Sequence, residues 1–268
     1  MINLDTIKKL RQSSGAGMVE CKKALEEAGG DIDKAMELLR KKGIAKAAKR
    51  GGHEASEGVI KLAVNDNKTE GCMVEINTET DFVARNDKFQ DFTDKILNLI
   101  KEHKPENLKG LMALRIDNTT VKETLENLSG TIGEKMDIKR FDILKTDGSV
   151  ASYSHAGGRI GALVSLSKKD SGALAYDIAM QVAASNPKYI NTEDVEEREI
   201  NKEKEIYKEQ LLKEGKPENI IDKIIIGKIN KYFEEVCLLK QDFIKDDKKK
   251  VEEILGDAKV EKFIRYSL

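Results

Sequence analysis

The 268-residue sequence lacks tryptophan and contains only three cysteines. Cys21, Cys72 and Cys237 lie far apart, and no two of them form a CxxC pair. An odd, widely spaced set of this kind matches neither a disulfide framework nor the ligand spacing of a zinc site. We therefore expect free thiols in a reducing compartment, the cytoplasm.

Long apolar runs are also missing. No run approaches the roughly 18 consecutive apolar residues that a transmembrane helix requires. The first residues, "MINLDTIKKLRQ", mix charges of both signs and lack the apolar segment of a secretory signal peptide. The sequence thus predicts a chain that neither crosses a membrane nor is exported by that route.

The chain has almost no net charge, because 47 lysines and arginines offset 48 aspartates and glutamates. Its overall field should neither attract nor repel a polyanion strongly. One local exception is the run from Arg40 to Arg50, which contains six positive and no negative side chains. This run could contact phosphates in a nucleic-acid or ribosome-associated binding protein. However, no aromatic or amide base-reading residues accompany it, so a solvated linker or a protein contact is favoured and direct nucleic-acid binding is not expected.

Features of a catalytic site are scarce. His53, His103 and His155 are isolated, so the sequence offers no local start for a metal site or a catalytic triad. The stretch "AGGRIG", residues 156–161, lacks the lysine and hydroxyl residue of a phosphate-binding loop and precedes a strand instead of a helix. We therefore expect no enzyme activity, no cofactor and no metal. An enzyme whose site is assembled from distant residues is the alternative from this class.

Residues 1–50 are predicted to form a compact module of three short helices. Apolar residues recur at helical spacing in each of them, and glycine-rich stretches interrupt the pattern between them. Asp31 is placed to cap the third helix and Gly43 to end it. The basic, Gly/Ala-rich segment from Lys41 to about residue 57 then predicts a linker to the rest of the chain.

Beyond the linker the apolar residues change from a helical period to alternation. "GVIKLAV" and "GCMVEIN" are short strands separated by a turn-forming segment, which predicts a β-hairpin, and a helix follows. The same layout recurs 90 residues later, where Gly148 and Gly161 take the places of Gly58 and Gly71. This recurrence predicts an internal duplication. The alternative is a chance match, since strands that begin with glycine are common.

The predicted fold class is α+β, with a core of two related hairpin-plus-helix subdomains. The core N-subdomain covers residues 58–138 and the core C-subdomain residues 139–268. "KRFDILKT" adds a further strand to this core, and "VEKFIRYSL" a closing one. The C-subdomain includes an antiparallel helical hairpin at about 194–236, in which Gly215 ends one helix and Pro217 begins the next. The apolar stripe of this hairpin suits self-association or docking.

The segment "INTETDFVARNDKF" places a phenylalanine among charged residues where a strand gives way to a helix. Phe82, Phe89 and Ile96 are each seven residues apart, so in one continuous helix they would share a buried stripe. Thr78 and Asp81 match a capping box at the entrance of such a helix. In the other interpretation, Phe82 lies on an exposed first turn beside Asp81 and acts as an apolar wedge for another protein.

At these residues the sequence resembles the bacterial translation elongation factor Ts family. "TDFVARN", residues 80–86, is the most specific match. Five further segments agree in the same order: "SGAGMVECKKAL", "GDIDKAMELLRKKG", "HAGGRIGALV", "IAMQVAASNPKYI" and "GKINKYFEEVCLLKQDFIKD". The resemblance covers essentially the whole chain, and it implies a ubiquitin-associated-like helical module, two related α+β subdomains and an inserted helical hairpin.

The resemblance also implies a function in protein biosynthesis. Members of the family are guanine-nucleotide exchange factors for elongation factor Tu, and they release GDP without making or breaking a bond. By motif match, Asp81 and Phe82, with Thr80 and Val83 beside them, would enter the GTPase near its magnesium and phosphate site. Small displacements there weaken nucleotide binding, because Mg²⁺ bridges phosphate and protein oxygens.

Four further contacts with elongation factor Tu follow from the resemblance. Arg11, Met18 and Val19 match the contact region of the N-terminal module, and His155 matches a contact in the second subdomain. On the residues alone, Met18 and Val19 also suit the core of a helical module, and His155 suits a structural histidine. Homodimerisation, through the helical hairpin or of the whole complex, is a further expectation.

Overall fold

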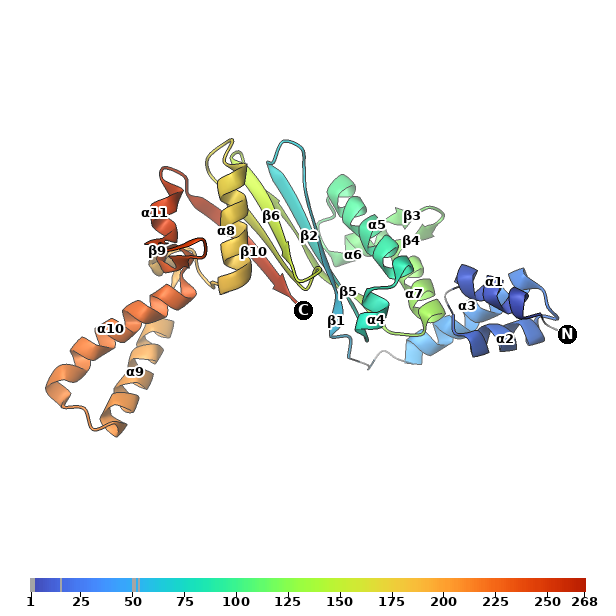
Figure 1. Ribbon diagram of the computed structural model, residues 1–268, viewed down its shortest axis with the longest axis horizontal. Helices are drawn as coiled ribbons and strands as arrows, with labels where there is room; N and C mark the ends of the chain where they lie inside the picture. The colour runs from blue at the N-terminus through green and yellow to red at the C-terminus, as the bar shows by residue number, and fades with distance from the viewer. Residues whose placement is uncertain (1–2, 15, 50–51, 53) are drawn as a thin grey trace.

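The computed structural model describes residues 3–14, 16–49, 52 and 54–268. Its elements lie in a row, with helices at one end, two small sheets and their helices in the middle, and a protruding helix pair at the other end (Figure 1). Arg50 and His53, which fell in the predicted linker, lie outside the described residues. Every helix in the described ranges is too short or too polar to cross a lipid bilayer.

The N-terminal region forms the three predicted helices, α1 Leu4–Ser14, α2 Met18–Glu27 and α3 Ile32–Lys49. They enclose a core of their own, made of Ile7, Leu10, Ala16, Cys21, Ala24, Leu25, Ala35 and Leu39. Asp31 caps α3 as predicted, because its Oδ1 accepts the backbone N–H groups of Asp33 and Lys34 at 3.0 and 3.1 Å.

The prediction that Gly43 ends the third helix, and that a linker begins at Lys41, is wrong. α3 continues to Lys49. Gly43 lies against the backbone of Gly130 in α7, and a Cβ built on Gly43 would stand 2.2 Å from the Gly130 carbonyl oxygen. The glycine therefore permits a close helix crossing, and packing outweighs its intrinsic helix penalty of about 1 kcal/mol.

The first sheet is antiparallel, with the strand order β1-β2-β5. Its strands are β1 Glu57–Val64, β2 Glu70–Thr78 and β5 Met136–Lys145. Between β2 and β5 the chain forms α4 Asp81–Ala84, α5 Asp87–His103, α6 Leu108–Ala113, β3 Arg115–Ile116, β4 Thr119–Thr120 and α7 Val121–Ile132. The buried stripe of α5, which includes Phe89 and Ile96, forms the core of this half with the sheet.

The second sheet is also antiparallel, with the order β10-β7-β6. Its strands are β6 Ser149–His155, β7 Ile160–Leu166 and β10 Val260–Ser267, and α8 Gly172–Ser185 packs on them. The remaining short elements are β8 Asp242–Phe243, β9 Asp246–Lys250, α11 Val251–Leu255 and single helical turns at Thr192–Asp194 and Leu238–Lys240. The two sheets with their helices confirm the predicted α+β class.

The protruding pair consists of α9 Glu197–Lys213 and α10 Glu218–Val236, as the apolar spacing predicted. Gly215 takes a positive φ of 72° between them. At the base of the pair, the hydroxyls of Tyr189 and Tyr232 both donate to the carboxylate of Glu199. The hydrogen bond to Glu199 raises the pKa of Tyr189 to about 12. This shared carboxylate fixes the base of the helical hairpin to the loop before it.

The two sheets repeat one topology and pack against each other. In each, a hairpin is followed by a helix, and a later strand pairs with the second strand of the hairpin. The sheets meet through Ile60, Met73, Leu144, Val150, Leu163 and Tyr266. A Cβ on Gly71 would lie 2.9 Å from Val150 Cγ1, and a Cβ on Gly161 would lie 2.6 Å from Ile60 Cγ2. The offset that relates Gly71 to Gly161 also relates Ile60 to Val150, so the packing itself is duplicated.

Candidate functional site

The exposed turn that holds Phe82 is built directly on the end of β2. The helix that follows is α4, and its N-cap is Thr80, whose hydroxyl oxygen accepts the backbone N–H of Val83 at 3.4 Å. The predicted capping pair of Thr78 and Asp81 is therefore wrong. Thr78 is still the last residue of β2, and its hydroxyl donates to Glu134.

Phe82 does not share a stripe with Phe89 and Ile96, because the helix is interrupted after α4. Asn86 begins a new helix, α5, where its side-chain oxygen accepts the N–H of Lys88 at 3.0 Å. Phe89 and Ile96 are fully buried, whereas Phe82 is 83% exposed. The core interpretation of Phe82 is thus wrong, and the ring stands in solvent on a four-residue helix.

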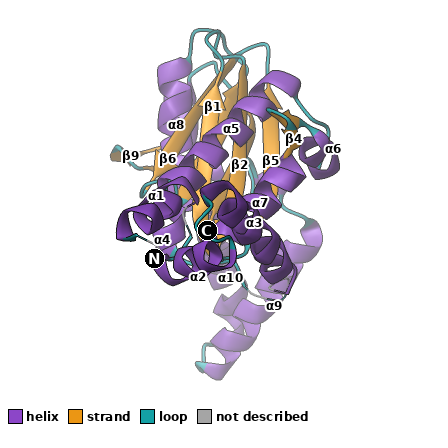
Figure 2. Cartoon of the chain, turned by 90° about the vertical axis from the view of Figure 1, so that its right-hand side faces the viewer, coloured by secondary structure: helices purple, strands orange, loops and turns teal. Residues whose placement is uncertain are grey.

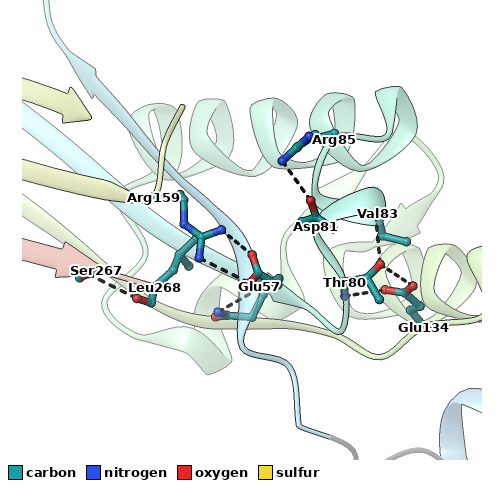
Figure 3. A network of polar contacts seen from close by, with 10 residues as sticks. Glu57, Thr80, Asp81, Val83, Arg85, Glu134, Arg159, Ser267 and Leu268 are labelled. Atoms are coloured by element: carbon teal, nitrogen blue, oxygen red, sulfur yellow. Dashed lines mark hydrogen bonds and ion pairs between the residues drawn. The ribbon is translucent and has the colours of Figure 1, made fainter. Parts of the chain in front are cut away.

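Two ion pairs lie at and near the α4 turn. The Asp81 carboxylate pairs with the Arg85 guanidinium at 3.0 Å, and the Glu57 carboxylate pairs with Arg159 at 2.5 Å (Figure 3). The hydrogen bond from Arg159 holds the pKa of Glu57 below its usual value, and the same contact raises the pKa of Arg159. Both pairs are partly exposed, so each contributes little to the stability of the fold.

Glu134 holds the turn from the opposite side. Its carboxylate accepts the Thr80 hydroxyl at 2.7 Å and the Thr80 backbone N–H at 3.0 Å (Figure 3). It also accepts the Thr78 hydroxyl at 3.1 Å. Hydrogen bonds to a charged acceptor are stronger than neutral ones. Sequence reasoning missed Glu134, because it lies just beyond α7 and meets the turn only in the folded chain.

A Glu134→Ala variant is expected to loosen the α4 turn without unfolding the protein. Removing the shared acceptor leaves the Thr80 N–H and two hydroxyls without their partner, a loss of about 1–3 kcal/mol at this turn. Hydrogen exchange of the Val83 and Ala84 amides should speed up by about tenfold or more. Glu126→Ala, on the exposed face of α7, is the matched control. Equal exchange rates in both variants would contradict the positioning role of Glu134.

The other predicted contact residues lie on the surface. Arg11 is exposed on α1, and Met18 and Val19, at the start of α2, are 36% and 66% exposed. His155, at the end of β6, is exposed and stacks on Tyr153 with 6.1 Å between ring centroids. The alternative in which Met18 and Val19 fill the helical core is therefore wrong.

Thr80 and Val83 differ from the other predicted contacts. Thr80 caps α4, and Val83 is only 9% exposed and packs in the core of the first subdomain. These two side chains shape the turn from within, whereas Asp81 and Phe82 face outward from it.

The structure brings Arg11 close to the α4 turn. An open groove lined by Lys8, Arg11, Gln12, Asn86, Asp87 and Lys88 runs between α1 and the start of α5. Its two sides are joined where Lys88 Nζ donates to the Ser13 carbonyl at 2.8 Å. Figure 2, which views the molecule from the end that carries the N-terminal helices, shows α1 and α4 on this same side.

The turn that follows His155 is tied to β1. The Ile60 N–H donates to the Gly158 carbonyl at 2.7 Å, and Arg159 pairs with Glu57 at the start of β1. The N-terminal helices are thus joined to the start of α5, and the turn after His155 is joined to β1. In the described part of the chain, no group of three His, Cys, Asp or Glu side chains is arranged to hold a metal ion.

Comparison with known proteins identifies the family. Residues 79–268 match the family model described as elongation factor TS. An elongation factor Ts of Prosthecochloris aestuarii is 44% identical over 100% of this chain and 98% of its own length. Elongation factors Ts of Clostridium perfringens and Halothermothrix orenii are 42% and 43% identical over 99% and 100% of this chain and 92% of their own lengths. The chain therefore belongs to the elongation factor Ts family of translation elongation factors.

Proposed function

We propose that this protein is a guanine-nucleotide exchange factor that binds elongation factor Tu in the cytoplasm. It promotes GDP release by disturbing the magnesium and phosphate site of the GTPase, and no bond is made or broken. One observation carries the proposal: Phe82 is 83% exposed, on a capped turn inside the segment that matches the family.

An exposed phenylalanine on a fixed turn is a source of binding free energy. Complete burial of such a ring against a partner stabilises a complex by about 1.5–3 kcal/mol. The caps of Thr80 and Asn86 and the bonds to Glu134 already order the turn in the free protein. Little conformational entropy is then lost on docking, so more of the burial free energy appears as affinity.

This binding free energy drives GDP release through reciprocal coupling. If the factor binds the nucleotide-free GTPase more tightly than the loaded one, nucleotide and factor each lower the affinity of the other by the same ratio. A tenfold effect corresponds to about 1.4 kcal/mol. A ring that displaces elements around the Mg²⁺ ion acts on a group that holds the nucleotide phosphates. Asp81 accompanies the ring and adds a negative charge beside that site.

The remaining contacts would extend the interface on both sides of the ring. Met18 and Val19 offer an exposed apolar pair, with the Arg11 cation on the neighbouring helix. His155 offers a stacked imidazole on the second subdomain. These residues are proposed to bind the GTPase and to keep Phe82 in register, while Phe82 itself perturbs the nucleotide site.

The alternative of a nucleic-acid-binding protein is less well supported. The basic run that suggested it is part of α3 as far as Lys49. Within this run, Lys41 pairs with Glu37 at 2.7 Å and Lys42 with Glu27 at 2.5 Å. Part of its positive charge is therefore neutralised inside the N-terminal helices, which weakens its attraction for phosphates.

Fluorescent GDP bound to elongation factor Tu provides the test. Adding the full-length chain with excess unlabelled GDP should speed the loss of fluorescence in proportion to its concentration, because the factor stabilises the nucleotide-free state. Unlabelled GDP without the chain gives the intrinsic rate. An unchanged rate would refute the proposal, and salt-sensitive RNA binding by the same preparation would then favour the alternative.

A further inference from the structure

We propose that Gly43 is a positioning residue, which holds the N-terminal helices in one place against the core. This inference rests on the proposed exchange function. According to this inference, Met18 and Val19 on α2 and Phe82 on α4 bind the GTPase as parts of one rigid surface. They do not bind as two domains joined by a flexible linker.

Gly43 lies inside α3, where a glycine is unfavourable unless packing requires it. Glycine in a helix interior costs about 1 kcal/mol relative to alanine, so a glycine there without a packing reason is a weakness. An added Cβ at Gly43 would lie 2.2 Å from the carbonyl oxygen, 2.4 Å from the carbonyl carbon and 2.7 Å from the Cα of Gly130. Contacts this short to a backbone cannot be relieved by a rotamer change. Only glycine allows α3 and α7 to cross here.

Two polar contacts hold the N-terminal helices to the rest of the protein at two separate places. One helical turn before Gly43, Arg40 Nε donates to Asn127 Oδ1 on α7 at 2.9 Å. Away from this crossing, at the end of α1, the Ser13 carbonyl accepts the Lys88 ammonium at 2.8 Å. A rotation of the N-terminal helices about the α3–α7 crossing would break the Lys88 contact. The three contacts together define one orientation.

A fixed orientation affects how the two surfaces bind. When two binding elements are joined in the correct geometry, the second one binds at a high effective concentration. A loose connection loses part of this gain, because the second element must be oriented during binding. Detaching α3 from α7 should therefore weaken binding even though no contact residue has been changed.

Gly43→Ala and Gly227→Ala form a matched pair for the experiment. Both glycines lie inside helices, and an added Cβ at Gly227 meets nothing within 4 Å. Both substitutions raise helix propensity, so they differ in what the new methyl group meets. In the full-length protein, NMR relaxation of backbone amides should show α1 and α2 tumbling faster than the core only in Gly43→Ala.

Exchange kinetics give the functional readout. Gly43→Ala should raise the half-saturating concentration for GDP release by roughly tenfold, because the effective-concentration gain is reduced. Its maximal rate should stay within about twofold of the wild type, since Phe82 is unchanged. Gly227→Ala should match the wild type in both quantities. Asn127→Ala, which removes a polar contact without adding volume, should change the half-saturating concentration in the same direction by a smaller factor.

A further substitution separates positioning from general damage. Val19→Ser should weaken exchange in the wild-type background and have a smaller effect in the Gly43→Ala background. The reason is that Gly43→Ala already reduces the contribution of Val19 by releasing the N-terminal helices from their fixed position. Equal effects in both backgrounds, or uniform tumbling of Gly43→Ala, would overturn the inference. If the wild-type chain does not release GDP, the proposed function fails, while the relaxation comparison still decides whether Gly43 fixes the helices.

Discussion

A Phe82→Ala variant is expected to lose about ten- to a hundredfold in exchange rate at limiting factor concentration, which corresponds to the 1.5–3 kcal/mol of burying the ring. Its free energy of unfolding should stay within about 0.5 kcal/mol of the wild type, because exposed side chains contribute little to stability. The ring is 83% exposed and α4 is capped by other residues. GDP release and urea denaturation of the same preparation measure the two quantities.

Phe89→Ala is the matched control for this experiment. Phe89 has the same side chain, lies seven residues further along and is fully buried in the core of the first subdomain. Its removal should lower the free energy of unfolding by about 3–5 kcal/mol. Loss of exchange with normal stability in Phe82→Ala would support the wedge role. A large stability loss in Phe82→Ala, or unaltered exchange, would contradict it.

The second large effect is expected where the two sheets meet. In Gly161→Val, the new Cβ would lie 2.6 Å from Ile60 Cγ2, 3.0 Å from Met73 Sδ and 3.1 Å from Leu62 Cδ1. Overpacking of this kind lowers the free energy of unfolding by about 1–3 kcal/mol. The valine has three side chains to displace, so the upper part of that range is expected. The midpoint of urea denaturation measures the loss.

A compensating substitution provides the control. Ile60→Ala alone creates a cavity and costs about 2–5 kcal/mol. In the double variant with Gly161→Val, the valine occupies the space that Ile60 vacates. The combined loss should therefore fall short of the sum of the two single losses by at least about 1 kcal/mol. Strictly additive losses would show that Gly161 and Ile60 do not pack as described.

Most helices and strands were predictable because their signals are local. The alternation of apolar residues after Gly58 and Gly71 extends over a few residues, and so does the helix-breaking segment between α9 and α10. The strands and helices that these signals predict appear where expected. The recurrence of glycines even indicated which strands are equivalent. The same signals did not reveal that Gly71 and Gly161 face the opposite sheet, because that contact joins residues distant in sequence.

The predictions that were wrong have identifiable physical causes. Glycine is common just after a helix end, so the sequence predicts a helix end at Gly43, but close packing against Gly130 determines its role. The interruption after α4 had a local signal, the capping residue Asn86, which the spacing of Phe82 and Phe89 obscured. The role of Glu134 could not be predicted from the residues around it, since its carboxylate accepts hydrogen bonds from a turn that is distant in sequence.

The duplicated packing of the two sheets has a consequence for the independence of the two halves. Ile60 and Met73 of one sheet cover Val150 and Leu163 of the other, so neither half can hide its apolar surface alone. One half on its own would expose this apolar surface to water, and a second copy could cover it only by association between molecules. Because both halves belong to one chain, the contact forms within a single molecule and does not depend on protein concentration.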